Sequence, residues 1–480
     1  MRRRAARMQA HTRKPIALAA ALLLLVFLTG CGGSWIRVQN VGSAPATVTL
    51  TYLDEDGRVV TSDTRVLAPG AATNFPQRDH QGLPEGYQGS ALIESDQPII
   101  ALRRVDMKGL TAEMVDGGTL SLGSGGTSVY MPLVMNRAGP WQSWSSRFNI
   151  QNLSDTTAAC VIITYISSET GRAVAYDPSP PGEGRADPAC PSGGRPVAPR
   201  ATLFRSSGSI RAPAGFSGAV RVESLSTSRG VPAANISATV ETWNDSFNLL
   251  TSYRALNRSE AGTRVLLPLI EREVGPDASF NTFFHMQSAD TSRVVRINLH
   301  LEGVDANGAP VVKDSAFSFR GARSCVQVAA DGANCLNPAD ALPSGFTGWA
   351  RIEASAPISV VVERGSYFYG YGTYAGVSQS NAASRVALPA VQGDSFLRIM
   401  TASGGSASVQ ARFISDDGSQ RTSTITVNGT ATVFLANLTP EGFDGAAILE
   451  ADSAIVAVAS YGVGGVGPDR GLLYEGAPLP

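Results

Sequence analysis

A thirteen-residue motif occurs four times in this chain, and it constrains the fold more than any other sequence feature. The copies, which start at Leu83, Ala212, Leu342 and Thr439, read LPEGYQGSALIES, APAGFSGAVRVES, LPSGFTGWARIEA and TPEGFDGAAILEA. In the third copy, Phe346, Gly348, Ala350 and Ile352 alternate with Thr347, Trp349, Arg351 and Glu353. Alternation with period two predicts a half-buried β-strand, and the Pro-x-Gly before it predicts a turn.

Other elements recur at similar distances from this motif. Segments that read as strand, polar turn, strand and hairpin turn begin with WIRVQN, RFNIQN, FFHMQS and FLRIMT, and the apolar strands VYMPLV, VLLPLI and VALPAV open all repeats but the first. Each unit thus has roughly six to eight short strands, with turn signals about every ten residues and no sustained helical periodicity. The sequence therefore predicts an all-β chain of four tandem antiparallel, immunoglobulin-like β-sandwich domains.

The expected domain limits follow the repeats. They are a signal peptide at 1–30, repeat 1 at 31–107, a Gly/Ser-rich linker at 108–127, repeat 2 at 128–256, repeat 3 at 257–376 and repeat 4 at 377–480. We use these repeat names throughout. A Gly/Ser-rich composition favours a flexible connection between the first two repeats.

The first thirty residues read as an export signal. Six basic residues precede the apolar run IALAAALLLLVFL, which is shorter than the roughly 20 residues of a membrane-spanning helix. The following LTGC resembles the bacterial lipobox, which implies cleavage before Cys31 and attachment of diacylglycerol to its thiol. An ordinary signal peptide and an uncleaved anchor are the alternatives. We expect the protein to be exported, lipid-anchored to the bacterial cell membrane through Cys31, and facing outside.

The charge balance argues against nucleic acid as a partner. Six of the 39 basic residues and none of the 40 acidic residues precede Cys31, so the remaining chain carries a formal net charge of −7. A mildly acidic chain has no electrostatic reason to bind phosphate backbones or anionic lipid.

The four other cysteines fall into two close pairs. Cys160 with Cys190 and Cys325 with Cys335 each lie inside one repeat and bracket an insertion that the other repeats lack. In an exported protein, this spacing predicts two local disulfides. A zinc site is the alternative, although no CxxC or clustered histidine accompanies either pair.

The combination of the PLV strand, the QN strand with its turn, the PxGFxGxA strand and a trailing TYAG or SYRA connector resembles tandem β-sandwich repeats of exported proteins from Chloroflexi-type bacteria. The resemblance covers nearly all of the chain after the signal. It implies an extracellular or surface module and carries over no catalytic residue.

Titratable side chains recur, but their spacing does not favour catalysis. Glu94, Glu223, Glu353 and Glu450 hold one motif position in separate repeats, whereas two-carboxylate chemistry needs the pair within about 10 Å. The acidic turns are better explained as hairpins than as calcium loops, and the histidines as ordinary strand residues than as a metal pair; the residues concerned are Asp54, Asp56, Asp305, Asp416, Asp417, His80, His285 and His300. We expect no metal and no cofactor.

Aromatic residues are the best binding candidates. Tyr367, Phe368, Tyr369, Tyr371 and Tyr374 crowd the connector after repeat 3, and tyrosine can stack on sugars or anchor an interface. Trp349 faces outward in the same repeat, and Trp141 and Trp144 lie in a loop. Packing between domains is the alternative role, because Tyr253 and Tyr474 occupy comparable connectors.

These patterns favour a non-enzymatic cell-envelope protein that displays its β-sandwich domains for structure or adhesion. The alternative is a surface receptor module for carbohydrate or protein, with the Tyr-rich connector and Trp349 as its site. Envelope polysaccharide and surface proteins are the expected partners, and an enzyme is the third possibility.

Overall fold

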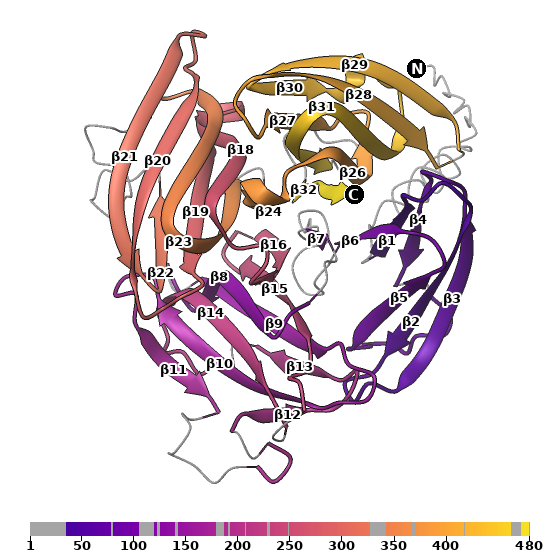
Figure 1. Ribbon diagram of the computed structural model, residues 1–480, viewed down its shortest axis with the longest axis vertical. Helices are drawn as coiled ribbons and strands as arrows, with labels where there is room; N and C mark the ends of the chain where they lie inside the picture. The colour runs from indigo at the N-terminus through magenta and orange to yellow at the C-terminus, as the bar shows by residue number, and fades with distance from the viewer. Residues whose placement is uncertain are drawn as a thin grey trace, which may run out of the picture. The chain divides into compact units, whose positions relative to one another are not determined.

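The structure is a computed structural model that describes residues 35–77, 80–104, 120–121, 125–139, 143–178, 187–190, 193–206, 208–227, 231–247, 249–326, 342–366, 370–416, 418–461 and 472–479. All described residues belong to one compact unit, Gly33–Pro480. These residues contain β-strands and three short 3-10 helices, and every strand pairing is antiparallel (Figure 1). The predicted all-β fold is confirmed, whereas Cys31 and the signal segment lie outside the described residues.

Repeat 2 shows the full strand plan of the fold. One sheet has the order β11-β10-β14-β8-β17 with β12 beside β10, and the other has the order β13-β9-β15-β16. Their bounds are β8 (Ser128–Asn136), β9 (Trp144–Asn152), β10 (Ala159–Ser167), β11 (Ala173–Asp177), β12 (Arg195–Val197), β13 (Thr202–Arg205), β14 (Phe216–Leu225), β15 (Ile236–Asn244), β16 (Leu249–Arg254) and β17 (Leu256–Asn257). Apolar side chains from both sheets share one core cluster, as in a β-sandwich.

Repeats 3 and 4 follow the same plan, with one long strand serving both sheets. The first part of β23 pairs with β18 and β20, and its second part pairs with β19 and β24; β31 divides in the same way. The elements are β18 (Gly262–Val274), η2 (Pro276–Ala278), β19 (Phe280–Ser288), β20 (Val294–Val304), β21 (Pro310–Arg320), β22 (Ala322–Val326), β23 (Phe346–Ser366), β24 (Gly370–Ala375), β25 (Val377–Ser378), η4 (Gln379–Asn381), β26 (Ala383–Gln392), β27 (Phe396–Thr401), β28 (Ser406–Ser415), β29 (Gln420–Asn428), β30 (Thr430–Phe434), η5 (Leu435–Asn437), β31 (Asp444–Tyr461), β32 (Leu472–Glu475) and β33 (Ala477–Leu479).

Repeat 1 is the shortest version of this plan. Its sheets have the orders β3-β2-β5 and β4-β1-β6-β7. The strands are β1 (Trp35–Asn40), β2 (Ala46–Leu53), β3 (Val59–Leu67), β4 (Ala72–Pro76), β5 (Ser90–Ser95), β6 (Ile99–Arg104) and β7 (Leu120–Ser121). Strand β7 lies within the predicted 108–127 linker, so part of that segment pairs with the sandwich. The exact domain limits stay predictions.

The repeated motif has a packing explanation. In each copy the aromatic ring lies over the glycine two residues later: the ring of Phe346 covers Gly348, and an added Cβ there would come within 2.6 Å of the ring. The same contact recurs at Gly89, Gly218 and Gly445. The glycine just before each aromatic, such as Gly345, has positive φ, which other residues adopt only at a cost. Both glycines are therefore required by the turn and the ring.

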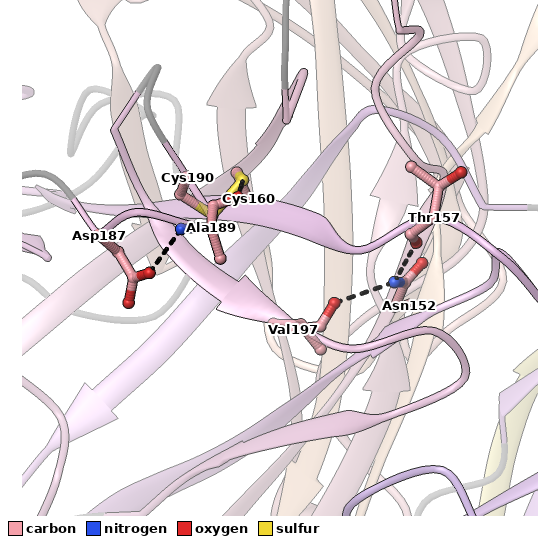
Figure 2. Close-up of a disulfide and its surroundings, with 7 residues drawn as sticks. All are labelled: Asn152, Thr157, Cys160, Asp187, Ala189, Cys190 and Val197. Atoms are coloured by element: carbon pink, nitrogen blue, oxygen red, sulfur yellow. Dashed lines mark hydrogen bonds between the residues drawn. A yellow bond between two sulfur atoms is a disulfide. The ribbon is translucent and has the colours of Figure 1, made fainter.

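The asparagine of the QN element ties a turn to the opposite sheet. Asn152 Nδ2 donates to Thr157 O at 2.8 Å, within its own turn, and to Val197 O at 3.0 Å, in β12 (Figure 2). Asn40 does the same in repeat 1, with Ala44 O and Leu67 O as acceptors. In repeat 4, Thr401 closes the corresponding turn through its hydroxyl. Threonine can therefore replace the asparagine of the QN element while the turn stays closed.

The strands that carry this element are covered on both faces. All six residues of β1 and all six of β27 are buried, whereas the first six residues of β28 alternate between exposed and buried. A sheet face that does not point into its own sandwich core is buried only if something else covers it. Contacts between repeats provide this cover, and they involve two of the candidate site residues, Trp349 and Tyr371.

Candidate functional site

Trp349 lies in the contact between repeats 3 and 4. Its side chain points away from the core of its own sandwich, as the alternation predicted, but only 8% of it is exposed. It belongs to a cluster with Leu266, Met400 and Val456, two of which come from repeat 4. The burial favours packing between repeats over stacking on a sugar, and the ligand-binding role of Trp349 stays a prediction.

Tyr371 occupies the contact between repeats 2 and 3. Its ring meets that of Trp144 edge to face, with centroids 5.2 Å apart, and both side chains are buried together with Leu249. The structure thus gives Tyr371 a packing role instead of a place in an exposed patch. Tyr367, Phe368 and Tyr369 lie outside the described residues, as does Trp141, so their part of the binding hypothesis remains a prediction.

Tyr374 is a hydrogen-bonding residue of the core. Its hydroxyl donates to Leu269 O at 2.7 Å and accepts from Leu269 N at 3.3 Å. Burial raises the pKa of Tyr374 well above its ordinary value, which keeps the hydroxyl protonated and able to donate. This ring too is buried, so it cannot bind a ligand at the surface.

The same tyrosine contact occurs in three repeats. Tyr253 bonds both backbone groups of Leu133, and Tyr474 bonds both backbone groups of Ala390. Each acceptor follows the proline of the opening strand, where the pairing register is interrupted. A bulge leaves backbone groups without ladder partners, and the hydroxyl satisfies both.

Two buried arginines join neighbouring repeats, and no sequence motif predicts them. Arg398 of repeat 4 donates to Pro268 O at 3.3 Å and to Gly348 O at 2.9 Å in repeat 3. Arg37 of repeat 1 donates to Pro389 O at 2.6 Å in repeat 4. Burial lowers the pKa of Arg398, yet a guanidinium stays charged at neutral pH. Both arginines take the third position of the aligned strands WIRVQN and FLRIMT, which is the signal that could have revealed them.

His285 holds the same aligned position in repeat 3. Its Nδ1 is 2.9 Å from Ser324 Oγ and its Nε2 is 3.2 Å from Glu363 Oε2, both in the same repeat. A serine, an imidazole and a carboxylate in a chain can serve nucleophilic catalysis when a substrate can reach the serine. His285 and Glu363 are buried, and next to them Gln287 Nε2 donates to Val220 O of repeat 2 at 3.2 Å. The arrangement is a buried polar network at a contact between repeats.

His300 lies on an exposed face, away from His285. A hollow of about 370 Å³ on this face is lined by Asn298, Leu299, His300, Asp314, Ser315, Ala316, Arg351 and Glu353. His300 Nδ1 is 2.8 Å from Asp314 Oδ1, and its ring is 5.3 Å from that of Trp349. This hollow combines hydrogen-bond donors, acceptors and a cationic side chain in one concave place.

The recurrent glutamates behave as exposed strand residues. Glu223, Glu353 and Glu450 each form an ion pair with an arginine of the same repeat, and their side chains are between 36% and 51% exposed. Glu94 is exposed as well. Because they lie in separate sheets, none of these carboxylates faces another across a site.

The acidic turns have hairpin roles. Asp305 accepts from the backbone N–H groups of Asn307 and Ala309, and Asp54 and Asp56 pair with Arg58. Asp416 instead pairs with Arg37 of repeat 1, and Asp417 is outside the described residues. His80 packs edge-on against Tyr52, with ring centroids 5.2 Å apart.

One predicted disulfide is present. Cys160 and Cys190 are bonded and buried, with Cα atoms 5.6 Å apart, and the bond fastens the segment after β11 to β10 (Figure 2). Cys335 lies outside the described residues, so its pairing with Cys325 stays a prediction. In the described ranges, no group of three or more His, Cys, Asp or Glu side chains is placed to hold a metal ion. The same ranges contain no helix that is long and apolar enough to cross a membrane.

Comparisons with known proteins add little to this picture. A scan against protein-family models found no match, and a search of curated proteins found none either. A search of solved structures returned "Crystal structure of tetra-tandem repeat in extending region of large adhesion protein". It is 9% identical, covers 92% of this chain and 93% of that chain, and has a TM-score of 0.08, a value too low to bear on fold or function.

Proposed function

We propose that this chain is a non-enzymatic structural and adhesive protein of the bacterial cell envelope, anchored to membrane lipid through Cys31 and facing outside. The observation that carries the proposal is the use made of its distinctive side chains. Trp349, Tyr371, Arg37 and Arg398 all serve contacts between repeats. Because these aromatic and cationic side chains join the repeats to one another, the protein is suited to a stable surface-display role.

Lipid attachment is tested first, because the rest of the proposal depends on it. Cells of the producing bacterium are labelled with a palmitate analogue, and the wild-type chain is compared with Cys31→Ala. The proposal expects label and membrane fractionation for the wild type, and loss of both for the variant. Label that persists in Cys31→Ala, or a wild-type chain that stays in the soluble fraction, would contradict it.

Adhesion and exposure are tested on the same cells. Protease added to intact cells should cleave the wild-type chain, and deletion of the gene should weaken attachment to a surface or disturb the envelope. Complementation by Cys31→Ala should fail to restore either property. Normal attachment and envelope integrity in the deletion strain would remove the structural role.

A receptor role for envelope polysaccharide or a surface protein is the second candidate, and the hollow beside His300 is the observation that favours it. Calorimetry with the producer's envelope polysaccharides would measure binding to the wild type and to His300→Ala. Arg412→Ala is the matched control, because Arg412 faces outward at the corresponding position of β28 in repeat 4. Binding lost only in His300→Ala would make this chain a receptor.

A further inference from the structure

One strand position is filled in repeats 2, 3 and 4, and no strand fills it in the described part of repeat 1. In repeats 2, 3 and 4, the motif strands β14, β23 and β31 pair on one side with β10, β20 and β28 and on the other with the opening strands β8, β18 and β26. In repeat 1, β5 pairs with β2 alone among the described residues, so it forms the edge of its sheet (Figure 1). The backbone groups along an unpaired strand edge are a template for another strand.

The core of repeat 1 is correspondingly open. The inward residues Ala91 and Ile93 are only half-buried, whereas their counterparts in the other three repeats are fully buried, with 0% exposure. Each opening strand supplies four apolar side chains to its core: Val129, Met131, Leu133 and Val134; Val265, Leu267, Leu269 and Ile270; Val386, Leu388, Ala390 and Val391. Repeat 1 therefore exposes apolar surface where such side chains would pack.

The open position continues into an established contact. The opening strand of repeat 3 also meets repeat 4, and that of repeat 4 meets repeat 1, since Pro268 O and Pro389 O accept from Arg398 and Arg37. Beside β5, Ser90 Oγ accepts from Gln151 Nε2 of repeat 2 at 3.0 Å. A strand added to β5 would thus lie beside repeat 2, as the opening strands of repeats 3 and 4 each lie beside another repeat.

We propose that the edge of β5 docks an extended segment of another polypeptide by β-strand addition. The segment runs antiparallel to β5, because all three opening strands run antiparallel to their motif strands. Its side chains follow the pattern of those strands, with aliphatic residues at alternate positions and a proline near the centre. The proposal rests on the sheet edge and not on lipid attachment, so its failure would leave the proposed function standing.

The probe is a synthetic peptide of residues 262–272, GTRVLLPLIER, which is the opening strand of repeat 3. Titrated into the full chain, it should bind with one-to-one stoichiometry and raise the thermal midpoint. The same peptide with Leu267→Asp should bind at least about tenfold more weakly, because the aspartate would enter the core. Hydrogen exchange should slow at the amides of β5 on peptide binding, with little change in β14, β23 and β31.

Variants of the chain separate this proposal from its competitors. Ile93→Asp should abolish peptide binding, whereas Glu94→Gln, which faces outward on the same strand, should bind normally; circular dichroism verifies that both fold. If Ile93→Asp does not fold, hydrogen exchange in the wild-type chain decides the proposal. There the Leu267→Asp peptide should fail to slow exchange at the amides of β5. Absence of binding, slow exchange at β5 before peptide is added, or a dimer that Ile93→Asp dissociates would each overturn the proposal. The last two results would assign the edge to this chain itself or to a second copy.

Discussion

Arg37 and Asp416, which are 379 positions apart in the chain, form a two-point ion pair: Nη2 of the arginine bonds Oδ1, and Nη1 lies 3.3 Å from Oδ2. Arg37 is fully buried and also donates to Pro389 O and to Asn74 Oδ1. The first strand of repeat 1 is therefore fixed to repeat 4. With the contacts between repeats 1 and 2, 2 and 3, and 3 and 4, every repeat contacts at least two others.

Removing the carboxylate partner should loosen this contact. Asp416→Ala leaves a buried guanidinium with fewer acceptors, and it should lower the free energy of unfolding by about 2 kcal/mol. Asp56→Ala is the control, because its pair with Arg58 is exposed on both sides and should be worth less than about 0.5 kcal/mol. Urea unfolding followed by circular dichroism measures both, and equal effects would show that pairing the buried guanidinium has no special weight.

The tyrosine contact can be tested by removing one oxygen. Tyr374→Phe keeps the ring but leaves both backbone groups of Leu269 without their hydroxyl partner, so we expect a loss of about 1 to 3 kcal/mol. Tyr253→Phe and Tyr474→Phe should cost similar amounts. Tyr176→Phe, on an exposed ring, is the control, and a Tyr374→Phe variant as stable as this control would refute the structural role.

Trp349→Ala separates packing from ligand binding. Because the ring is buried between repeats 3 and 4, its removal should destabilise the protein by about 3 to 5 kcal/mol without any ligand present. Val66→Ala removes an exposed apolar side chain and should change stability by less than about 0.5 kcal/mol. Thermal unfolding tests both variants. An unchanged midpoint for Trp349→Ala would return this residue to the set of binding candidates.

Reduction of the Cys160–Cys190 bond should also destabilise the protein. The bond closes a loop with a sequence separation of 30, for which the chain-entropy relation gives about 3 to 4 kcal/mol. The double variant Cys160→Ala/Cys190→Ala should show this loss in the absence of reductant. Any further effect of dithiothreitol on that variant would report on other cysteines, and a wild type unaffected by reduction would contradict the prediction.

Stability should fall at alkaline pH because tyrosines are buried in their neutral form. Burial raises the pKa of Tyr165 to about 12 and raises that of Tyr374 and Tyr474 further. A raised folded-state pKa means that the stabilisation is present below pH about 10 and is lost as pH rises toward the folded values. Unfolding measured across this range, with tyrosine ionisation followed by ultraviolet absorbance, tests the sign. Ionisation of all tyrosines near pH 10 in the folded protein would contradict it.

The sequence alone determined the parts that depend on local pattern. Alternation predicted the motif strand and its inward residues Phe346, Ala350 and Ile352, all of which are fully buried. Turn chemistry predicted the hairpins, and cysteine spacing predicted the Cys160–Cys190 bond. The motif strand persists in every copy because each sandwich needs the same glycine beneath an aromatic ring.

The tertiary structure alone decided what covers the outward faces. Alternation places Trp349 on the outer face of its sheet, but it cannot say whether solvent or a neighbouring repeat lies there. The aromatic connector likewise made Tyr371 a candidate binding residue. The partner that buries it, Trp144, is more than two hundred residues away. Arg37 carries no periodic signal that points to Asp416. Contacts between repeats depend on how whole sheets meet, and no short window of sequence contains both sides of such a contact.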